Sequence, residues 1–159
     1  MADSSDKRLQ ELANALMMNS KHVDEIGLLH GKLGIIIFLF YYSRFTGDTK
    51  YEDYAGDLID EVYDNLSAKT LLDFENGLMG IGWGIEYLSQ NGFVEVDTDE
   101  ALIELDKNIW KSDIDIPFIL EINKKIFGHG LYFLQRTKEN RSSFLENKQF
   151  ETRLLPDAC

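Results

Sequence analysis

The chain has 159 residues, of which 44% are hydrophobic and 28% charged, and a formal net charge of −12 at pH 7. This length suits a single domain, and the composition argues against extensive disorder. The negative charge argues against binding to nucleic-acid phosphates or to anionic membrane surfaces.

One cysteine, Cys159, excludes an internal disulfide framework and a cysteine-based zinc cage within one chain. The N-terminal residues are too polar for a secretory signal. The longest apolar run, residues 33–42, is about half of what a membrane span requires. These features predict a soluble, cytoplasmic protein.

The chain begins with two segments of helical character. The first has an apolar stripe at helical spacing, formed by Leu9, Leu12, Ala13, Leu16 and Met17. The second follows a glycine-rich stretch at residues 27–34 and is apolar on every face from Ile35 to Tyr42. Such a segment predicts a helix that is buried all round.

Residues 49–66 give the clearest amphipathic pattern in the chain. Thr49 and Glu52 have the spacing of a capping box, which predicts the start of this helix. Its polar side carries Glu52, Asp53, Asp57, Asp60, Glu61 and Asp64. This acidic side is interpreted either as an ordinary solvated face or as a docking surface.

The glycine-rich pattern then recurs. Residues 77–88 follow residues 27–38 at an interval of 50, which aligns Gly77 with Gly27 and Gly84 with Gly34. A third, shorter copy covers residues 127–134, with Gly130 aligned to Gly84. Between the second and third copies, Asp97 predicts a carboxylate cap for a further helix.

A period near 50 residues with helical content predicts an array of helical hairpins. We expect one all-α domain over residues 1–159, with hairpins at about 7–46, 49–90 and 97–136 and a C-terminal tail at about 139–159. Apolar helices would form an inner layer and amphipathic helices an outer layer, as a two-layer arc or ring.

Gly80, Gly82 and Gly84 need a physical reason, because each glycine destabilises a helix interior by about 1 kcal/mol relative to alanine. Close backbone approach would supply one, and Gly84, aligned with Gly34 and Gly130, suggests a place where helices nearly touch. A substrate passing over bare backbone would supply another.

The three Gly-Leu-x-x-Gly-x-x-Gly-Ile-like stretches, at 27–39, 77–88 and 128–134, resemble the lanthionine synthetase C-like family. The resemblance spans roughly residues 7–136 and is to the N-terminal part of its members. It implies an α/α toroid, of which three hairpins would form an incomplete α/α barrel. It also implies kinship with zinc-dependent lanthipeptide cyclases, which add a cysteine thiol to a dehydrated serine or threonine. Zinc lowers the pKa of that thiol.

The family's zinc ligands are a cysteine and a later Cys-His pair, and this chain has no such pair. We therefore expect no metal site and no cofactor in this chain. His30 and His129 are weak candidates for a catalytic role, and each is also interpreted as a helix-entry histidine bonded to local backbone. In the repeat alignment His30 matches Gly80 and His129 matches Trp83, so they are not repeats of one position.

Four aromatic residues, Tyr41, Tyr42, Trp83 and Tyr132, could line a ring interior and bind an apolar peptide or a sugar face. The alternative is that they are plain core residues. Among these, Tyr41, Trp83 and Tyr132 are the candidate peptide-binding residues.

Three functions remain open at this point. The first is a lanthionine synthetase C-like fragment or short paralogue, inactive alone, which binds a peptide or complements a missing C-terminal part. The second is the N-terminal part of a zinc-dependent, thioether-forming cyclase. The third is a carbohydrate-active α/α barrel, which would need two inward acids where the apolar helices offer only Glu86. An open ring would expose apolar flanks such as Leu9–Met17 and Leu131–Leu134, which predicts a homo-oligomer. The alternative is that the three hairpins collapse into a compact monomeric bundle.

Overall fold

The computed structural model describes residues 4–67, 69–111 and 119–137, and these contain helices and loops but no strand. In chain order the elements are α1 (Ser4–Asn19), the short 3-10 helix η1 (Ser20–His22), α2 (Lys32–Thr46), α3 (Lys50–Asp64), α4 (Leu78–Gln90), α5 (Thr98–Ala101), α6 (Ile103–Lys111) and α7 (Ile119–Arg136). The predicted all-α fold is confirmed. The predicted tail lies outside the described residues, and the hairpin boundaries stay a prediction.

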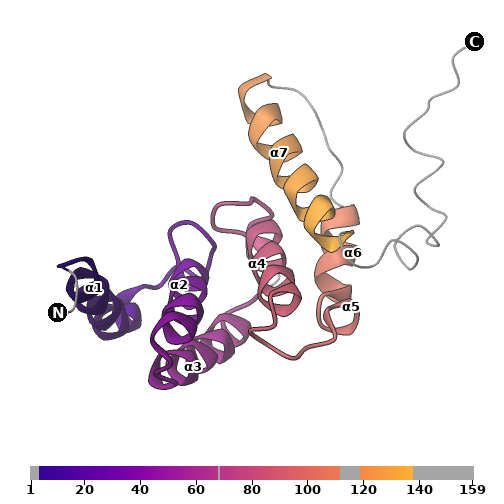
Figure 1. Cartoon of the computed structure of the whole chain (residues 1–159). Helices are drawn as coiled ribbons and strands as arrows, with labels where there is room; N and C mark the ends of the chain where they lie inside the picture. Colours follow the sequence, from indigo (N-terminus) through magenta and orange to yellow (C-terminus); the bar gives the residue numbers. More distant parts are fainter. Residues whose placement is uncertain (1–3, 68, 112–118, 138–159) are drawn as a thin grey trace, which may run out of the picture.

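The helices follow one another across the molecule, with α1 at one end and α5, α6 and α7 at the other (Figure 1). The most extensive packing joins α2 to α3 and α4 to α7, and a smaller contact joins α2 to α4. This arrangement is an open arc, not a compact bundle around one axis. Each described helix is too short or too polar to cross a lipid bilayer.

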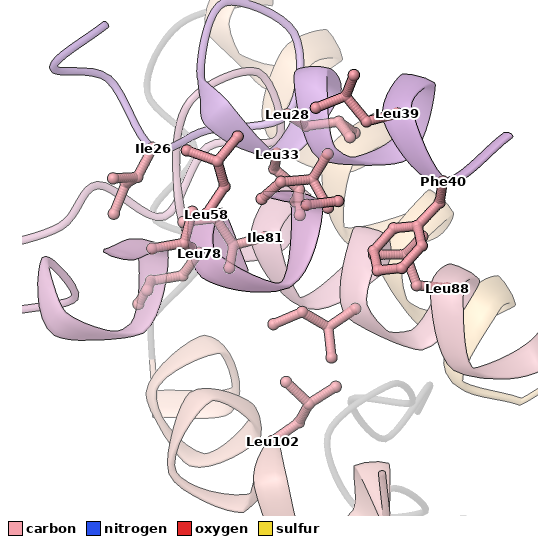
Figure 2. Close-up of a cluster of buried hydrophobic side chains, with 14 of the residues drawn as sticks. Ile26, Leu28, Leu33, Leu39, Phe40, Leu58, Leu78, Ile81, Leu88 and Leu102 are labelled. Atoms are coloured by element: carbon pink, nitrogen blue, oxygen red, sulfur yellow. The ribbon is translucent and has the colours of Figure 1, made fainter. Parts of the chain in front are cut away.

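The apolar helices α2 and α4 lie at the centre of the core. Leu33 of α2 and Ile81 of α4 are almost completely buried, and Figure 2 shows them among the clustered side chains. Helix α3 buries one stripe, mainly against α2, formed by Tyr51, Ala55, Leu58 and Val62. The predicted amphipathic pattern of this helix therefore has its physical cause in one-sided burial.

The loops before α2 and α4 have the same hydrogen-bond pattern. The N–H of Lys32 donates to the carbonyl of Glu25 at 2.9 Å, and the N–H of Leu78 donates to the carbonyl of Leu71 at 2.7 Å. The donors of these two hydrogen bonds are 46 residues apart, and so are the acceptors. The structural repeat is therefore 46 residues and not the predicted 50. The two loops also contact each other, because the N–H of Leu29 donates to the carbonyl of Glu75 at 2.8 Å.

The alignment of Gly77 with Gly27 is therefore wrong. Gly77 and Gly31 are the equivalent residues, since each has an extended backbone and directly precedes its helix. A Cβ on Gly31 would lie 2.4 Å from the nitrogen of Gly27, and one on Gly77 would lie 2.3 Å from the carbonyl oxygen of Leu71. Only glycine fits where the loop folds back this closely on the helix start.

The third predicted glycine-rich entry is also wrong, because Gly128 and Gly130 lie inside α7. This helix begins at Ile119, so the glycines come after its start and no loop folds back at them. A Cβ on Gly130 would meet nothing within 4 Å. Gly130 is tolerated in the helix and is not a close-approach position like Gly84.

One predicted helix cap is confirmed and one is wrong. The Asp97 carboxylate accepts hydrogen bonds from the N–H groups of Asp99 and Glu100, at 3.0 and 3.2 Å. Thr49 makes no side-chain cap, because its own backbone is already helical. The Asp48 carboxylate instead accepts from the N–H of Lys50 at 3.2 Å.

Candidate functional site

A continuous row of aromatic rings crosses α2, α4 and the loops beside them. Trp83 stacks on Tyr87 with ring centroids 5.0 Å apart and an interplanar angle of 10°. Tyr87 lies 6.4 Å from Tyr41, whose ring meets Phe93 edge-on at 4.7 Å. At the other end, Phe74 packs edge-on against Trp83 at 5.9 Å. We call these five residues the aromatic row.

Two phenol groups give the aromatic row a polar centre. The hydroxyls of Tyr41 and Tyr87 lie 2.5 Å apart and share a hydrogen bond. This bond, together with partial burial, raises the pKa of the Tyr87 hydroxyl. The Tyr87 hydroxyl is therefore protonated near neutral pH. Each phenol oxygen can both donate and accept, so the pair keeps further capacity for hydrogen bonds. Tyr41 is 41% exposed, and Trp83 and Tyr87 are half-buried, so these rings reach the surface.

Arg44 holds one end of the aromatic row in place. Its guanidinium carbon lies 3.6 Å from the centroid of the Phe93 ring. The same guanidinium donates to the carbonyls of Asn91 and Gly92, at 3.0 and 3.1 Å. The turn after α4 is thereby fixed to α2, since Arg44 belongs to α2 and the carbonyls follow α4.

The structure brings Tyr41 and Trp83 together through Tyr87, which sequence reasoning did not single out. Tyr41 and Tyr87 are 46 residues apart, so the corrected repeat would have paired them. Tyr42 faces the other way and packs edge-on against Tyr51 of α3 at 4.7 Å. Tyr132 is completely buried, so it does not contribute to the exposed row.

Tyr132 belongs instead to a largely buried network of charges that joins α4, α5, α6 and α7. The guanidinium of Arg136 donates to the carboxylates of Glu86 and Asp106, at 2.6 and 2.8 Å, and to that of Asp99 at 3.2 Å. The hydroxyl of Tyr132 donates to Asp106. Burial and the nearby Asp106 carboxylate raise the pKa of the Tyr132 hydroxyl. Burial lowers the pKa of the Arg136 guanidinium, but the Asp106 and Glu86 carboxylates raise it by more, so the net shift is upward.

Sequence reasoning identified Glu86 only as a lone acid in an apolar helix. Its position carried a signal, because a buried carboxylate requires a cation or hydrogen-bond donors. The structure shows both: the Arg136 contact, and a hydrogen bond from Gln90 Nε2 to Glu86 Oε1 at 2.7 Å. Glu86 therefore stabilises the packing of α4 on α7 and does not face an open surface.

The two candidate histidines lie in different surroundings. His30 is exposed in the loop before α2, and the 46-residue repeat aligns it with Asn76 and not with Gly80. His129 is half-buried within α7, with its ring 6.3 Å from that of Phe133.

Zinc binding requires several histidine, cysteine or carboxylate groups that converge on one point. In residues 4–67, 69–111 and 119–137, no three such side chains do so. These residues therefore do not fit the zinc site that the resemblance implies.

Comparison with known proteins gives a match to a protein family. The model of a family described as lanthionine synthetase C-like protein matches residues 22–147, which include α2 to α7. No curated protein and no solved structure gives a significant match to the chain.

Proposed function

The chain belongs to the lanthionine synthetase C-like family, and from this we propose that it is a peptide-recognition module that is inactive by itself. The peptide would lie along the aromatic row. In this proposal the chain positions an apolar or hydroxyl-bearing peptide, and any zinc-dependent chemistry depends on residues outside the described part.

The observation that carries the proposal is the exposure of the aromatic row on the apolar helices. Tyr41 is exposed and the other four rings are half-buried, and rings that reach the surface supply contact area at a low cost in conformational entropy. The paired hydroxyls of Tyr41 and Tyr87 supply hydrogen bonds in the middle of that area. This combination suits a peptide with apolar side chains next to backbone or serine and threonine donors.

A second candidate function is the N-terminal part of a zinc-dependent cyclase. Family membership favours it, and the aromatic row would then guide the substrate peptide toward a zinc site built elsewhere. The carbohydrate-active alternative has less support, because Glu86 is buried against Arg136 and provides no inward acid for glycoside cleavage.

Peptide recognition can be tested by calorimetry with capped decapeptides that contain serine, threonine, cysteine and leucine. Trp83→Ala and Tyr41→Ala are each expected to weaken binding about tenfold, because each removes a ring from the contact surface. Phe45→Ala is the matched control, since Phe45 is an exposed aromatic residue of α2 outside the row. Equal losses in all three variants, or binding of maltooligosaccharides in preference to the peptides, would contradict the proposal.

We also propose that the outer side of α7 is covered by a second copy of the chain or by a C-terminal part of the toroid. Phe127, Leu131 and Leu134 lie on one side of α7 and are 70%, 41% and 65% exposed. Apolar patches of this kind mark interfaces.

Light scattering of the 159-residue chain at micromolar concentration is therefore expected to give a dimer. Leu131→Lys should return it to a monomer, whereas Leu71→Lys, at an exposed loop position, should not. A monomeric parent chain would rule out the dimer.

A further inference from the structure

Tyr41 and Tyr87 form a pair of phenol groups that reaches the surface from two helices of the core. Tyr41 belongs to α2 and Tyr87 to α4, far apart in the sequence. Their hydroxyl oxygens lie 2.5 Å apart, and their rings are inclined by 39° with centroids 6.4 Å apart. The hydroxyl-bearing ends of the two rings therefore meet.

The pair is open to solvent, unlike a second pair of tyrosines in the core. Tyr41 is 41% exposed and Tyr87 is half-buried. Tyr42 and Tyr51 also touch, with ring centroids 4.7 Å apart, but they are only 7% and 2% exposed. An oxidant in solution can therefore reach the first pair of rings, and the fold shields the second.

Two phenol rings that meet in this way have the arrangement needed for oxidative coupling. Removal of one electron and the hydroxyl proton converts a tyrosine into a phenoxyl radical. Its unpaired electron is shared with the two Cε carbons, which lie on either side of the hydroxyl-bearing carbon. Two such radicals combine through one Cε carbon of each ring. Each of these carbons then loses its hydrogen as a proton, and each oxygen regains a proton, so both phenols are restored.

We propose that Tyr41 and Tyr87 are a site of oxidative cross-linking, where a peroxidase with hydrogen peroxide joins the two rings by a Cε–Cε bond. The two tyrosines together lose two electrons and two protons, and one molecule of hydrogen peroxide takes them up to become two molecules of water. The rings have to approach further to form the bond, and the exposure of Tyr41 leaves its ring room to move. The reaction needs no bound peptide, so it is independent of the proposed function.

The rings beside the pair favour reaction at these two tyrosines. Trp83 stacks on Tyr87 with centroids 5.0 Å apart. An electron lost from the indole is replaced by one from the phenol, because the deprotonated tyrosyl radical is the more stable of the two near neutral pH. On the other side, Phe93 meets Tyr41 edge-on at 4.7 Å, and its ring carries no group that is oxidised under these conditions. Oxidation of this part of the aromatic row therefore ends at the tyrosine pair.

The new bond would reinforce a contact that the fold leaves small. Helix α2 packs much less extensively on α4 than on α3, and α4 packs mainly on α7. The single cysteine of the chain provides no internal disulfide. A covalent link between α2 and α4 restricts the unfolded chain as a disulfide does, which stabilises the folded state. We expect the melting temperature of the cross-linked chain to rise by several degrees.

Oxidation of the purified chain with a peroxidase and hydrogen peroxide tests the proposal, followed by dityrosine fluorescence and mass spectrometry of a proteolytic digest. We expect a chain that runs as a monomer under denaturing conditions, is lighter by two hydrogen atoms and has residues 41 and 87 joined. Tyr41→Phe and Tyr87→Phe should each abolish this link, because phenylalanine keeps the ring but lacks the hydroxyl. Tyr63→Phe is the matched control, since Tyr63 is 38% exposed and lies outside the aromatic row, and it should leave the yield unchanged.

Unfolding separates the effect of the fold from the general reactivity of tyrosine. Photochemical oxidation by a ruthenium complex with persulfate works in urea as well as in buffer. In urea the seven tyrosines of the chain are no longer held in place, so the yield of the internal link should fall several-fold. An equal yield in urea, a loss with Tyr63→Phe as large as that with Tyr41→Phe, or covalent dimers without the internal link would each overturn the proposal.

Discussion

Gly84→Leu is expected to lower the free energy of unfolding by about 3 kcal/mol, although leucine favours helix over glycine. A Cβ at position 84 would lie 2.5 Å from Cδ2 and 2.9 Å from Cγ of Leu33. Leu33 is 1% exposed and enclosed by the core, so it has no free space into which to move. The contact between α2 and α4 would have to open, and this contact connects the two halves of the arc.

Gly130→Ala is the matched control for this prediction. Both glycines lie inside a helix, but a Cβ on Gly130 would meet nothing within 4 Å. The alanine should therefore raise the free energy of unfolding by up to about 1 kcal/mol. Urea unfolding followed by circular dichroism measures both variants. A Gly84→Leu variant as stable as the parent would contradict the prediction, because it would show that α2 and α4 can move apart without a loss of stability.

The close approach at Gly84 was predictable from sequence, but its place in the repeat was not. Sequence matching aligned Gly84 with Gly34, and the structure gives these glycines different neighbours. A Cβ on Gly34 would lie 2.5 Å from the carbonyl oxygen of Leu28 in its own loop. The equivalent of Gly34 is Gly80, which faces the carbonyl oxygen of Phe74 in the same way. The 46-residue interval follows from backbone hydrogen bonds, and residue identities alone do not reveal them.

The candidate sites were also predictable only in part. Tyr41 and Trp83 could be singled out as aromatic residues within apolar helices, and the structure brings them together. Tyr87 and Phe93 complete the aromatic row, but their roles depend on how α2 and α4 cross. The partners of the buried Arg136 charge are harder to find from sequence. Asp106 lies on the polar side of an amphipathic pattern, which predicts a solvent-exposed side chain.

Arg136→Ala is expected to lower the free energy of unfolding by about 3–5 kcal/mol. The side chain of Arg136 is 4% exposed, and those of Glu86 and Asp106 are 6% and 17% exposed. Removal of the guanidinium leaves two carboxylates close together with little access to water. Their desolvation and mutual repulsion then destabilise the packing of α4 and α6 against α7.

Glu86→Gln should have a smaller effect, of about 1–3 kcal/mol. Both carboxylate oxygens of Glu86 accept hydrogen bonds, one from Gln90 and the other from Arg136. Glutamine retains one acceptor and replaces the other with a donor. The ion pair with Glu86 is lost, but no carboxylate is left without a partner, because Arg136 still contacts Asp106 and Asp99. This variant should therefore be more stable than Arg136→Ala.

Lys107→Ala is the control for an ordinary ion pair, since Lys107 contacts Glu104 at 2.6 Å with side chains 51% and 77% exposed. Its effect on the free energy of unfolding should be below about 0.5 kcal/mol, because solvent screens exposed pairs. Urea unfolding of all three variants gives the comparison. An effect of Arg136→Ala as small as that of Lys107→Ala would mean that water reaches the network, and that α7 is held to α4 by apolar contacts and the hydrogen bonds between Gln90 and Gln135.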